Sequence, residues 1–559
     1  MSELLTAVAV IFIVVGPFLL VANRFDLPTV PLLILAGIVS GFFIDEELTL
    51  ELAQYGIALL VFSFGVGIDL SGIRTVLADS EIAALGQIFV AGSLGFGLGV
   101  ALGVSPDEAI YFAIAAALSS TIVGTALFRT EIRKDLVRGR LAESIHLVQD
   151  LVAIVFLLVL GAGTLAADPI ATQLGYGVTL LVVAVLVNRY LFDAVGKLAG
   201  GSDELMIIGV ISLLVVFIGA AEFVGVSIVV GAFAAGLAVR HDPVEYLGLF
   251  NGLESIKDFF VAIFFVTVGA LITFPFVEIG WTESVEKVLL AGVLVVLTAI
   301  VKPAVTTAIL LFRGYEARSA TLTSLSIDQV SEFALIIAIQ ALLLGTLSEL
   351  VFDAIILAAA VTMITSSLSQ RHDERLYRAL ATRGVLPRGH GKVNEWSDVP
   401  EGVTDHVVIV GYGRQGRRLA DACDRLEQPY VVIENDPSLR DAVTAECAAY
   451  VFGDAMERYT WEKANVETAR LVFSTVDSEP VSRRILAFEF ESDVILRASD
   501  ESTALELLEA GPLYVSVSDL LAGERLVQHL QALLENGKAP EELREERLSE
   551  LNEPTSSNR

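Results

Sequence analysis

Residues 138–161 read RGRLAESIHLVQDLVAIVFLLVLG, and this stretch decides the fold of the first part of the chain. After Arg140 it is long and apolar enough for a membrane, since about 20 apolar residues rising 1.5 Å each cross roughly 30 Å of hydrocarbon. It also carries Asp150 near the middle of the span. A carboxylate at that depth costs at least about 2.5–3.5 kcal/mol, so we predict a functional role for Asp150. The alternative is a permanently paired carboxylate that stabilises a helix bundle.

Apolar runs of similar length recur through residues 1–370, and the whole chain is 54% hydrophobic, 19% charged and has a mean hydropathy of +0.68. We therefore predict a polytopic α-helical membrane protein followed by a cytoplasmic α/β domain. Thirteen helices can form two inverted six-helix repeats around a connecting helix, as in secondary transporters. The predicted transmembrane helices are 4–22, 28–44, 51–69, 81–103, 107–128, 138–161, 169–190, 204–220, 223–239, 256–275, 285–312, 318–344 and 350–369.

The basic residues of the predicted loops are distributed asymmetrically. Thirteen Lys and Arg residues fall in one alternating set of loops, and only Lys287 falls in the other set. Because cytoplasmic loops retain the positive residues, we expect an external N-terminus and a cytoplasmic C-terminal domain in a multi-pass protein of the cytoplasmic membrane. The thirteen are Arg24, Arg74, Arg129, Arg133, Lys134, Arg138, Arg140, Arg189, Lys197, Arg240, Lys257, Arg313 and Arg318.

The fifth and twelfth spans occupy corresponding positions in the two halves, and both contain polar interruptions. Backbone carbonyls freed at broken helices are where transporters bind dehydrated cations. We therefore expect an ion site where these two spans meet. The polar residues are Ser119, Ser120, Thr121 and Gly124 in the fifth span, and Ser324, Ser326, Asp328, Gln329, Ser331 and Glu332 in the twelfth.

Lys302 lies inside the eleventh span and precedes Pro303. A buried ammonium needs a compensating carboxylate to keep its proton, so we expect Asp150 and Lys302 to form a coupled pair that serves proton exchange. The alternative is a salt bridge that only joins two helices. Asp328 and Glu332 are four residues apart and are expected on one helical face. Glu332 either bonds neighbouring hydroxyls or lines the ion path.

Glu143 and His146 precede Asp150 by seven and four residues, so they are expected on the same helix face and nearer the cytoplasm. Histidine titrates near physiological pH. This placement favours pH sensing or a proton relay, and a solvated helix end is the alternative.

These motifs resemble those of the monovalent cation:proton antiporters of the second group, in particular Kef-type K+/H+ and related Na+/H+ exchangers. The resemblance covers nearly all of residues 1–370 and is carried by LSSTIV at 118–123, QDLVA at 149–153, Lys302-Pro303 and QVSEF at 329–333. It implies that Asp150 binds cation and proton in competition, with Ser120 and Thr121 beside it. It also implies that Lys302 is the partner in the inverted half, and that a core moves like an elevator against a dimerising scaffold.

The residue before the essential carboxylate bears on stoichiometry. Electrogenic members of that family have a second Asp there, whereas this chain has Gln149, which implies one-for-one, electroneutral exchange. The chain also departs from the Kef-type pattern at Asp328 and Ser331, where a small or amide residue and a glycine are more usual. The extra carboxylate of Asp328 could restore a second proton or change the preferred ion, and the choice between K+ and Na+ stays open.

A polar linker at 371–404 leads to HVVIVGYGRQGR at 406–417, a short strand that runs into G-x-G-x-x-G and then a helical run. Three glycines alone are weak evidence. Here a second strand at 430–433 ends in Glu434, 23 residues after Gly411, as a dinucleotide-binding fold requires. Further strands at 449–452, 471–474, 493–496 and 513–516, separated by helices, predict a parallel, doubly wound, Rossmann-like sheet.

Each glycine of the loop has a physical role in that fold. Gly411 permits the tight turn, Gly413 lets the backbone approach a pyrophosphate at the helix N-terminus, and Gly416 allows helix and strand to pack closely. Glu434 would bind the ribose diol and repel a 2'-phosphate, which favours NAD(H) over NADP. Asp454 either contacts the adenosine or caps the following helix. The alternative is a Rossmann fold that binds nothing.

Residues 405–520 resemble the TrkA-type NAD-binding domain, the first lobe of the regulators of K+ conductance. A second lobe is not apparent, and residues 521–559 are predicted to be a helical, charged tail. Because the sequence offers no catalytic His-carboxylate set or nucleophile, we expect NAD(H) to be a regulatory ligand and the protein not to be an enzyme.

The composition excludes other classes. With a net charge of -30, nucleic acid is not an expected partner. Cys423 and Cys447 are expected to be reduced, and no metal site is predicted. The sequence thus favours a homodimeric antiporter that exchanges K+ or Na+ for protons. A nucleotide-gated K+ efflux channel is the alternative, although no T-V-G-Y-G filter segment occurs.

Overall fold

The computed structural model describes residues 3–25, 27, 29–67, 78–126, 136–160, 167–199, 202–240, 246–276, 280–386, 395–534, 541–545 and 548. The chain forms two compact units. The first comprises Met1–Arg313 with Arg318–Leu380, and the second comprises Gly314–Ala317 with Ala381–Arg559. Several basic residues used above for orientation, including Arg74, Arg129, Arg133 and Lys134, lie outside the described residues, as does part of the predicted linker.

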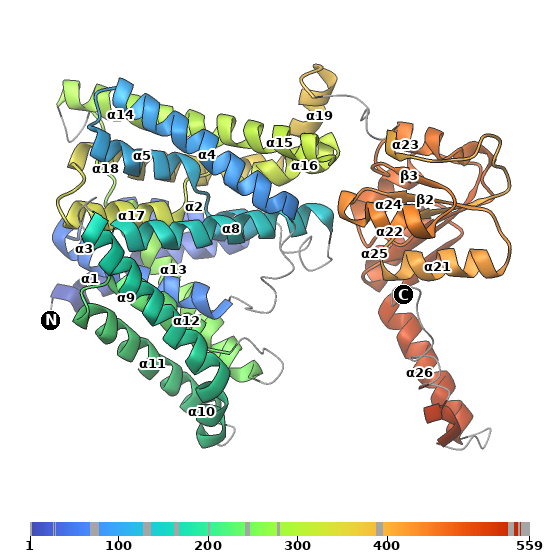
Figure 1. Cartoon of the computed structure of the whole chain (residues 1–559), viewed down its shortest axis with the longest axis horizontal. Coiled ribbons are helices and arrows are strands. Elements are labelled where there is room, and N and C mark those ends of the chain that lie inside the picture. The colour runs from blue at the N-terminus through green and yellow to red at the C-terminus, as the bar shows by residue number, and fades with distance from the viewer. Residues whose placement is uncertain are drawn as a thin grey trace. The chain divides into compact units, whose positions relative to one another are not determined.

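All the secondary-structure elements that the structure describes in the first unit are helices (Figure 1). Its first half contains α1 (Glu3–Arg24), α2 (Thr29–Gly41), α3 (Glu46–Gly67), α4 (Ala78–Ala101), α5 (Pro106–Ala117), α6 (Thr121–Ala126) and α8 (Val137–Leu160). A connecting segment follows, made of α9 (Ala167–Leu186), a π-helical turn at Val187–Leu191 and α10 (Phe192–Ala199).

Its second half contains α11 (Asp203–Phe223), α12 (Ile228–Leu237), α13 (Leu247–Ala270), α14 (Trp281–Val296), α15 (Lys302–Arg313), α16 (Ala317–Ser324), α17 (Glu332–Leu343) and α18 (Glu349–Arg371), and is followed by α19 (Asp373–Thr382). A π-helical turn at Leu297–Val301 joins α14 to α15 directly before Lys302. Such turns inside helices are frequent at functional sites.

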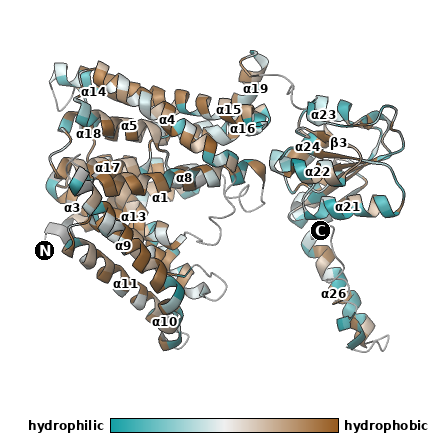
Figure 2. Cartoon of the chain, in the orientation of Figure 1, coloured by the Kyte–Doolittle hydropathy of each residue, from teal (hydrophilic) through white to brown (hydrophobic). Residues whose placement is uncertain are grey.

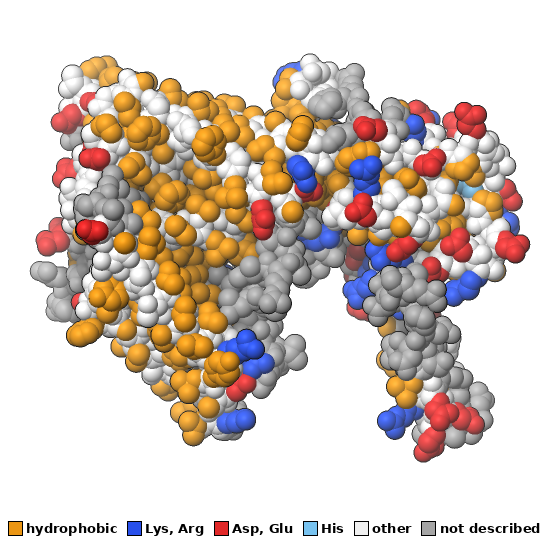
Figure 3. All heavy atoms as spheres, viewed as in Figure 1, with side chains coloured by type: hydrophobic (Ala, Val, Ile, Leu, Met, Phe, Trp, Pro, Cys, Tyr) orange, Lys and Arg blue, Asp and Glu red, His pale blue; other side chains and the backbone are white. Residues whose placement is uncertain are grey.

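The first unit has the length and the surface of a membrane protein. Among the described residues, ten helical segments are long and apolar enough to span a membrane, and Thr29–Gly41 and Ile228–Leu237 are shorter apolar helices. The predicted number of thirteen therefore stays a prediction. Large apolar side chains such as Phe223 (91% exposed) and Phe312 (79%) face outward. The helices of this unit are largely apolar (Figure 2), and hydrophobic side chains are spread over much of its visible face (Figure 3). Such a surface suits lipid.

Two groups of helices build this unit. One consists of α4, α5, α8, α14, α15, α17 and α18, and the other of α1, α2, α3, α9, α11, α12 and α13. Paired glycines bring helices of the second group into close contact. A Cβ added at Gly37 of α2 would lie 2.2 Å from the Val266 carbonyl oxygen of α13, and one at Gly236 of α12 would lie 2.2 Å from the Phe62 carbonyl oxygen of α3. Only glycine permits these approaches, as at other small-residue crossings in membranes.

The second unit is a six-stranded parallel sheet in the order β3-β2-β1-β4-β5-β6, with helices between successive strands. Its strands are β1 (Val407–Val410), β2 (Tyr430–Glu434), β3 (Tyr450–Phe452), β4 (Leu471–Ser474), β5 (Asp493–Ala498) and β6 (Tyr514–Val517). Its helices are α21 (Arg414–Arg425), α22 (Arg440–Glu446), α23 (Arg458–Lys463), α24 (Glu479–Leu486), α25 (Glu501–Glu509) and α26 (Ser518–Leu534). The strand order reverses beside β1, so the sheet is doubly wound, as predicted.

Candidate functional site

Two broken helices meet in the first unit. The first break separates α5 from α6 at Leu118–Ser120, and the second separates the short 3-10 turn Leu325–Ile327 from α17. Ser119 donates its hydroxyl to the Ile327 carbonyl at 3.0 Å, and the Gln329 side chain donates to the Ser120 carbonyl at 2.9 Å. The polar residues predicted in the fifth and twelfth spans therefore do come together.

Lys302 joins the two breaks. Its ammonium donates to the carbonyl oxygens of Leu118 and Gln329, both at 2.8 Å, and its side chain is fully buried. Each carbonyl is one that its broken helix leaves free. The expected pair of Lys302 with Asp150 is wrong, because the Lys302 ammonium binds these two backbone carbonyls instead.

Asp150 and Glu332 both accept hydrogen bonds from Thr121. The Thr121 hydroxyl donates to Asp150 Oδ2 at 2.7 Å, and the Thr121 and Ile122 amides donate to Glu332 Oε1 at 3.2 and 3.3 Å. Both acids are almost fully buried. Asp150 Oδ1 and Glu332 Oε2 have no hydrogen-bond partner in the described part of the chain. Two buried carboxylates with free oxygens are a suitable site for a cation or a proton.

Gln149 has a positioning contact that the sequence did not reveal. Its side-chain oxygen accepts the Ser119 amide at 3.0 Å, and its nitrogen donates to Gln87 Oε1 at 2.6 Å. Gln87, fully buried in α4, in turn donates to the Ala117 carbonyl at 2.6 Å. Sequence reasoning missed Gln87, although an amide inside the apolar span 81–103 was a usable signal. The Ser120 hydroxyl accepts the Val123 amide at 3.2 Å and so caps α6.

Asp328 does not share a helical face with Glu332, and that expectation is wrong. The chain is not helical from Asp328 to Ser331, because α17 begins only at Glu332. Asp328 is buried and accepts the Ser369 hydroxyl of α18 at 2.6 Å through Oδ2, and its Oδ1 has no partner among the described residues.

His146 is buried beside the place where the two broken helices meet, so a solvated helix end, the alternative considered for it, is wrong. A Cβ added at Gly124 would lie 2.4 Å from His146 Nε2 and 2.5 Å from the Ser326 carbonyl oxygen, so glycine makes room for the imidazole. Neither ring nitrogen has a hydrogen-bond partner within the described ranges. Glu143, one turn earlier on α8, is exposed.

Lys287 lies inside α14 and not in the external loop assigned to it from the sequence. It is 1% exposed and donates to Asp353 Oδ2 at 2.8 Å and to the Thr273 carbonyl at 2.7 Å. This buried pair was missed because Lys287 stands near the start of the span, where a lysine normally reaches water.

The glycine loop of the second unit has the predicted geometry. Gly411 has a φ of +88°, and a Cβ added at Gly416 would lie 1.9 Å from the Gly411 carbonyl oxygen. Gly413 forms the N-cap of α21 without a side-chain cap, and a Cβ added there meets no atom within 4 Å. Open space therefore lies beside uncapped helix amides, which is what a pyrophosphate requires.

Glu434 closes this loop from the end of β2. Its carboxylate accepts the amides of Tyr412 at 2.6 Å, Asn435 at 2.8 Å and Asp436 at 2.9 Å. Burial and the nearby Asp436 raise the pKa of Glu434. With about four acceptor positions on a carboxylate, one is left beyond these three amides. Asp454 is buried and accepts the Met456 amide at 2.9 Å, a turn contact just before α23.

A family comparison decides the identity of the first unit. Residues 9–371 match the family described as sodium/hydrogen exchanger, transmembrane, and residues 407–517 match the TrkA-N domain. The chain belongs to the sodium/hydrogen exchanger family. The predicted resemblance to cation:proton antiporters with a TrkA-type domain, the fold class and the antiporter function are confirmed, and the channel alternative is not favoured. Membership favours a transporter over an enzyme.

Relatives of the whole chain carry similar names. YbaL of Escherichia coli strain K12, named a candidate cation/proton antiporter, is 27% identical, with 93% of this chain and 95% of YbaL covered. KefB of Alkalimonas amylolytica, named a candidate K+ efflux antiporter, is also 27% identical, with 89% and 75% covered. The sodium proton antiporter MjNhaP1 of Methanocaldococcus jannaschii shares the fold, with a TM-score of 0.51, 15% identity and 67% and 99% covered.

Proposed function

We propose that this exchanger couples K+ or Na+ movement to proton movement at Asp150. The observation that carries the proposal is the free Oδ1 of a buried carboxylate whose other oxygen is held by Thr121. A cation and a proton would compete for this oxygen, because binding either one neutralises the buried charge. The names of the relatives, a cation/proton antiporter for YbaL and a K+ efflux antiporter for KefB, support this proposal.

The neighbouring residues would have distinct tasks. Glu332 would supply a second oxygen while it holds the start of α6, and Lys302 would hold both breaks together. Gln149 would position Ser119, and Ser120 would cap α6. Asp328 would be a further ion-binding or proton-binding group.

His146 and Glu143 are proposed to relay or sense protons on the cytoplasmic side of Asp150. His146 supports this best, since it is a buried titratable group one turn from Asp150 with no partner in the described part of the chain. We also propose that the protein lies in the plasma membrane. Its N-terminus would be outside the cell, and its second unit would be in the cytoplasm.

The second unit is proposed to bind NAD(H) as a regulatory ligand. Gly411, Gly413 and Gly416 would accommodate the pyrophosphate at the start of α21, and Glu434 would use its remaining acceptor position for the ribose. Asp454 would contact the adenosine, or only cap its turn. Bound NAD(H) would contribute no chemistry to transport and would act through differential affinity for two arrangements of a homodimer.

The proposed domains are a transport domain at 1–370, a linker at 371–404, a nucleotide-binding domain at 405–520 and a tail at 521–559.

The test of the function uses purified full-length protein in liposomes with a pH-sensitive dye inside. Imposed K+ and Na+ gradients, applied in turn, should drive proton movement in the opposite direction. Cation movement without proton movement would support the channel instead.

A further inference from the structure

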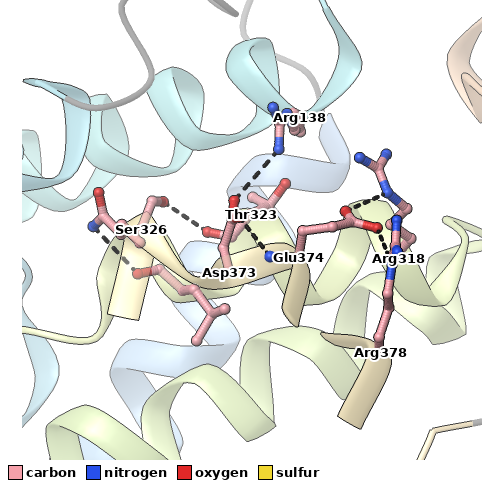
Figure 4. Close-up of polar contacts among 9 residues, drawn as sticks. Arg138, Arg318, Thr323, Ser326, Asp373, Glu374 and Arg378 are labelled. Atoms are coloured by element: carbon pink, nitrogen blue, oxygen red, sulfur yellow. Dashed lines mark hydrogen bonds and ion pairs between the residues drawn. The ribbon is translucent and has the colours of Figure 1, made fainter. Parts of the chain in front are cut away.

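Helix α19 follows directly after α18 and is fastened to two other helices by charged contacts (Figure 4). Asp373 lies 3.5 Å from the Arg138 guanidinium, measured from Oδ2 to Nη1. Glu374 accepts Arg318 Nε at 2.9 Å through Oε2 and Arg378 Nε at 3.0 Å through Oε1. We call these five residues the charged clamp.

The two cross-helix arginines occupy equivalent positions. Arg138 is the second residue of α8, and Arg318 is the second residue of α16. A cation in the first turn of a helix faces the positive end of the helix dipole, which is unfavourable unless a carboxylate compensates. Asp373 and Glu374 supply that carboxylate while they occupy the favourable first turn of α19.

The two pairs that join α19 to other helices are partly shielded from water, whereas Arg378 is 60% exposed, so the cross-helix pairs are stronger than ordinary surface pairs. The Arg318 side chain is 11% exposed, and Tyr377 on the same helix is buried. Burial raises the pKa of Glu374, but Arg318 and Arg378 outweigh it and bring that pKa below its ordinary value. Glu374 is therefore ionised at neutral pH.

The clamped helices are those that build the ion site. Helix α8 carries His146 and Asp150, and α16 runs into the second break through Thr323 and Ser326, whose hydroxyl donates to the Thr323 carbonyl at 2.7 Å. Helix α18 itself carries Ser369, the partner of Asp328. A single short helix is thus attached to three elements of the transport core.

We propose that the charged clamp makes α19 a rigid extension of the transport core, so that a force on the linker reaches the ion site. Without the clamp, α19 would lose its charged contacts with α8 and α16, and it follows α18 across an interruption at His372, which has a φ of -121°. A movement of the linker would then be absorbed by rotation at His372. The transmission of a nucleotide signal rests on the proposed regulation, whereas the rigidity of α19 does not.

The first test measures rigidity by amide hydrogen exchange of 373–382 in the full-length protein. The variant carries Arg138→Gln and Arg318→Gln. The control carries Arg375→Gln, within α19, and Arg383→Gln, just after it. Both control positions are exposed, and the control removes the same total charge as the variant. We expect exchange in α19 to rise at least about threefold in the variant and to stay unchanged in the control. Unchanged exchange in the variant would overturn the proposal.

The second test measures transport in liposomes with and without NAD(H) for the same proteins. The variant should keep its basal rate within about twofold of wild type, because the clamp does not touch the ion site, and should lose the nucleotide response. An undiminished response would overturn the transmission role. A wild type without any response would instead contradict the proposed regulation, and hydrogen exchange would still decide the rigidity of α19.

Discussion

Glu332 offers a sharp test of the crossing, because its carboxylate accepts the Thr121 and Ile122 amides at 3.2 and 3.3 Å. An amide donating to an ionised acceptor contributes about 1.5–3 kcal/mol, and to a neutral acceptor about 0.5–1.5 kcal/mol. Glu332→Gln keeps an acceptor oxygen and removes a charge whose burial is costly, so the weaker hydrogen bonds and the relieved burial should largely offset each other. Glu332→Ala leaves two buried amides unpaired, at about 1–3 kcal/mol each, and should cost about 4 kcal/mol.

Thermal unfolding of the purified protein in detergent measures the effect on stability. The KM for the cation, from proton movement in liposomes, measures the effect on cation binding. We expect the midpoint of thermal unfolding to change little for Glu332→Gln and to fall clearly for Glu332→Ala, which leaves two buried amides unpaired. Loss of the proposed cation oxygen should also raise the KM about tenfold in Glu332→Gln, which corresponds to about 1.4 kcal/mol. An unchanged midpoint in Glu332→Ala, or an unchanged KM in Glu332→Gln, would refute the reasoning.

Three further predictions concern the nucleotide loop, the stoichiometry and the acid stability of the second unit. Gly413→Ala should leave the domain folded, because its Cβ meets no protein atom, but should abolish NAD(H) binding by calorimetry, whereas Gly416→Ala should destabilise the domain; equal effects of both would contradict this. Transport should be electroneutral because Gln149 replaces an acid, so a rate that follows an imposed membrane potential would be a contrary result, and Asp328→Ser should then restore voltage independence. Burial lowers the pKa of His406, against the opposing effects of its bond to the Ala464 carbonyl and of a nearby aspartate. Because the His406 pKa is lower in the folded than in the unfolded state, its neutral form stabilises the second unit fully above about pH 6.5, and this stabilisation is lost as the pH falls through the folded pKa. His406→Gln should flatten the pH dependence of the free energy of unfolding. The same pH dependence in wild type and variant would count against this prediction.

Much of the fold could be predicted because its signals are local. Apolar length predicts a transmembrane helix without any knowledge of its neighbours, and alternation of strands and helices around G-x-G-x-x-G predicts the doubly wound sheet. The break at Leu118–Ser120 was visible as adjacent hydroxyl residues. The exact number of spans was not accessible, since α2 and α12 are short and Lys287 stands within α14.

The partners of the buried polar groups could not be predicted. Lys302 was expected to pair with Asp150, but broken helices free carbonyl oxygens, and the sequence does not show which side chain will reach them. The helical spacing of Asp328 and Glu332 misled for the same reason, because periodicity assumes an unbroken helix. Gln87 was overlooked because a single amide in a span is a weak signal until its contacts are known.

The central claim is that Asp150 carries the exchange, and Asp150→Asn tests it most directly. The substitution keeps the shape and an acceptor oxygen for the Thr121 hydroxyl but removes the charge that cation and proton share. Wild type and variant are purified, checked for equal thermal stability, and reconstituted at equal density with a pH-sensitive dye. We predict that a K+ or Na+ gradient moves protons through the wild type and moves none through Asp150→Asn. Proton movement at the wild-type rate in the variant would contradict the account.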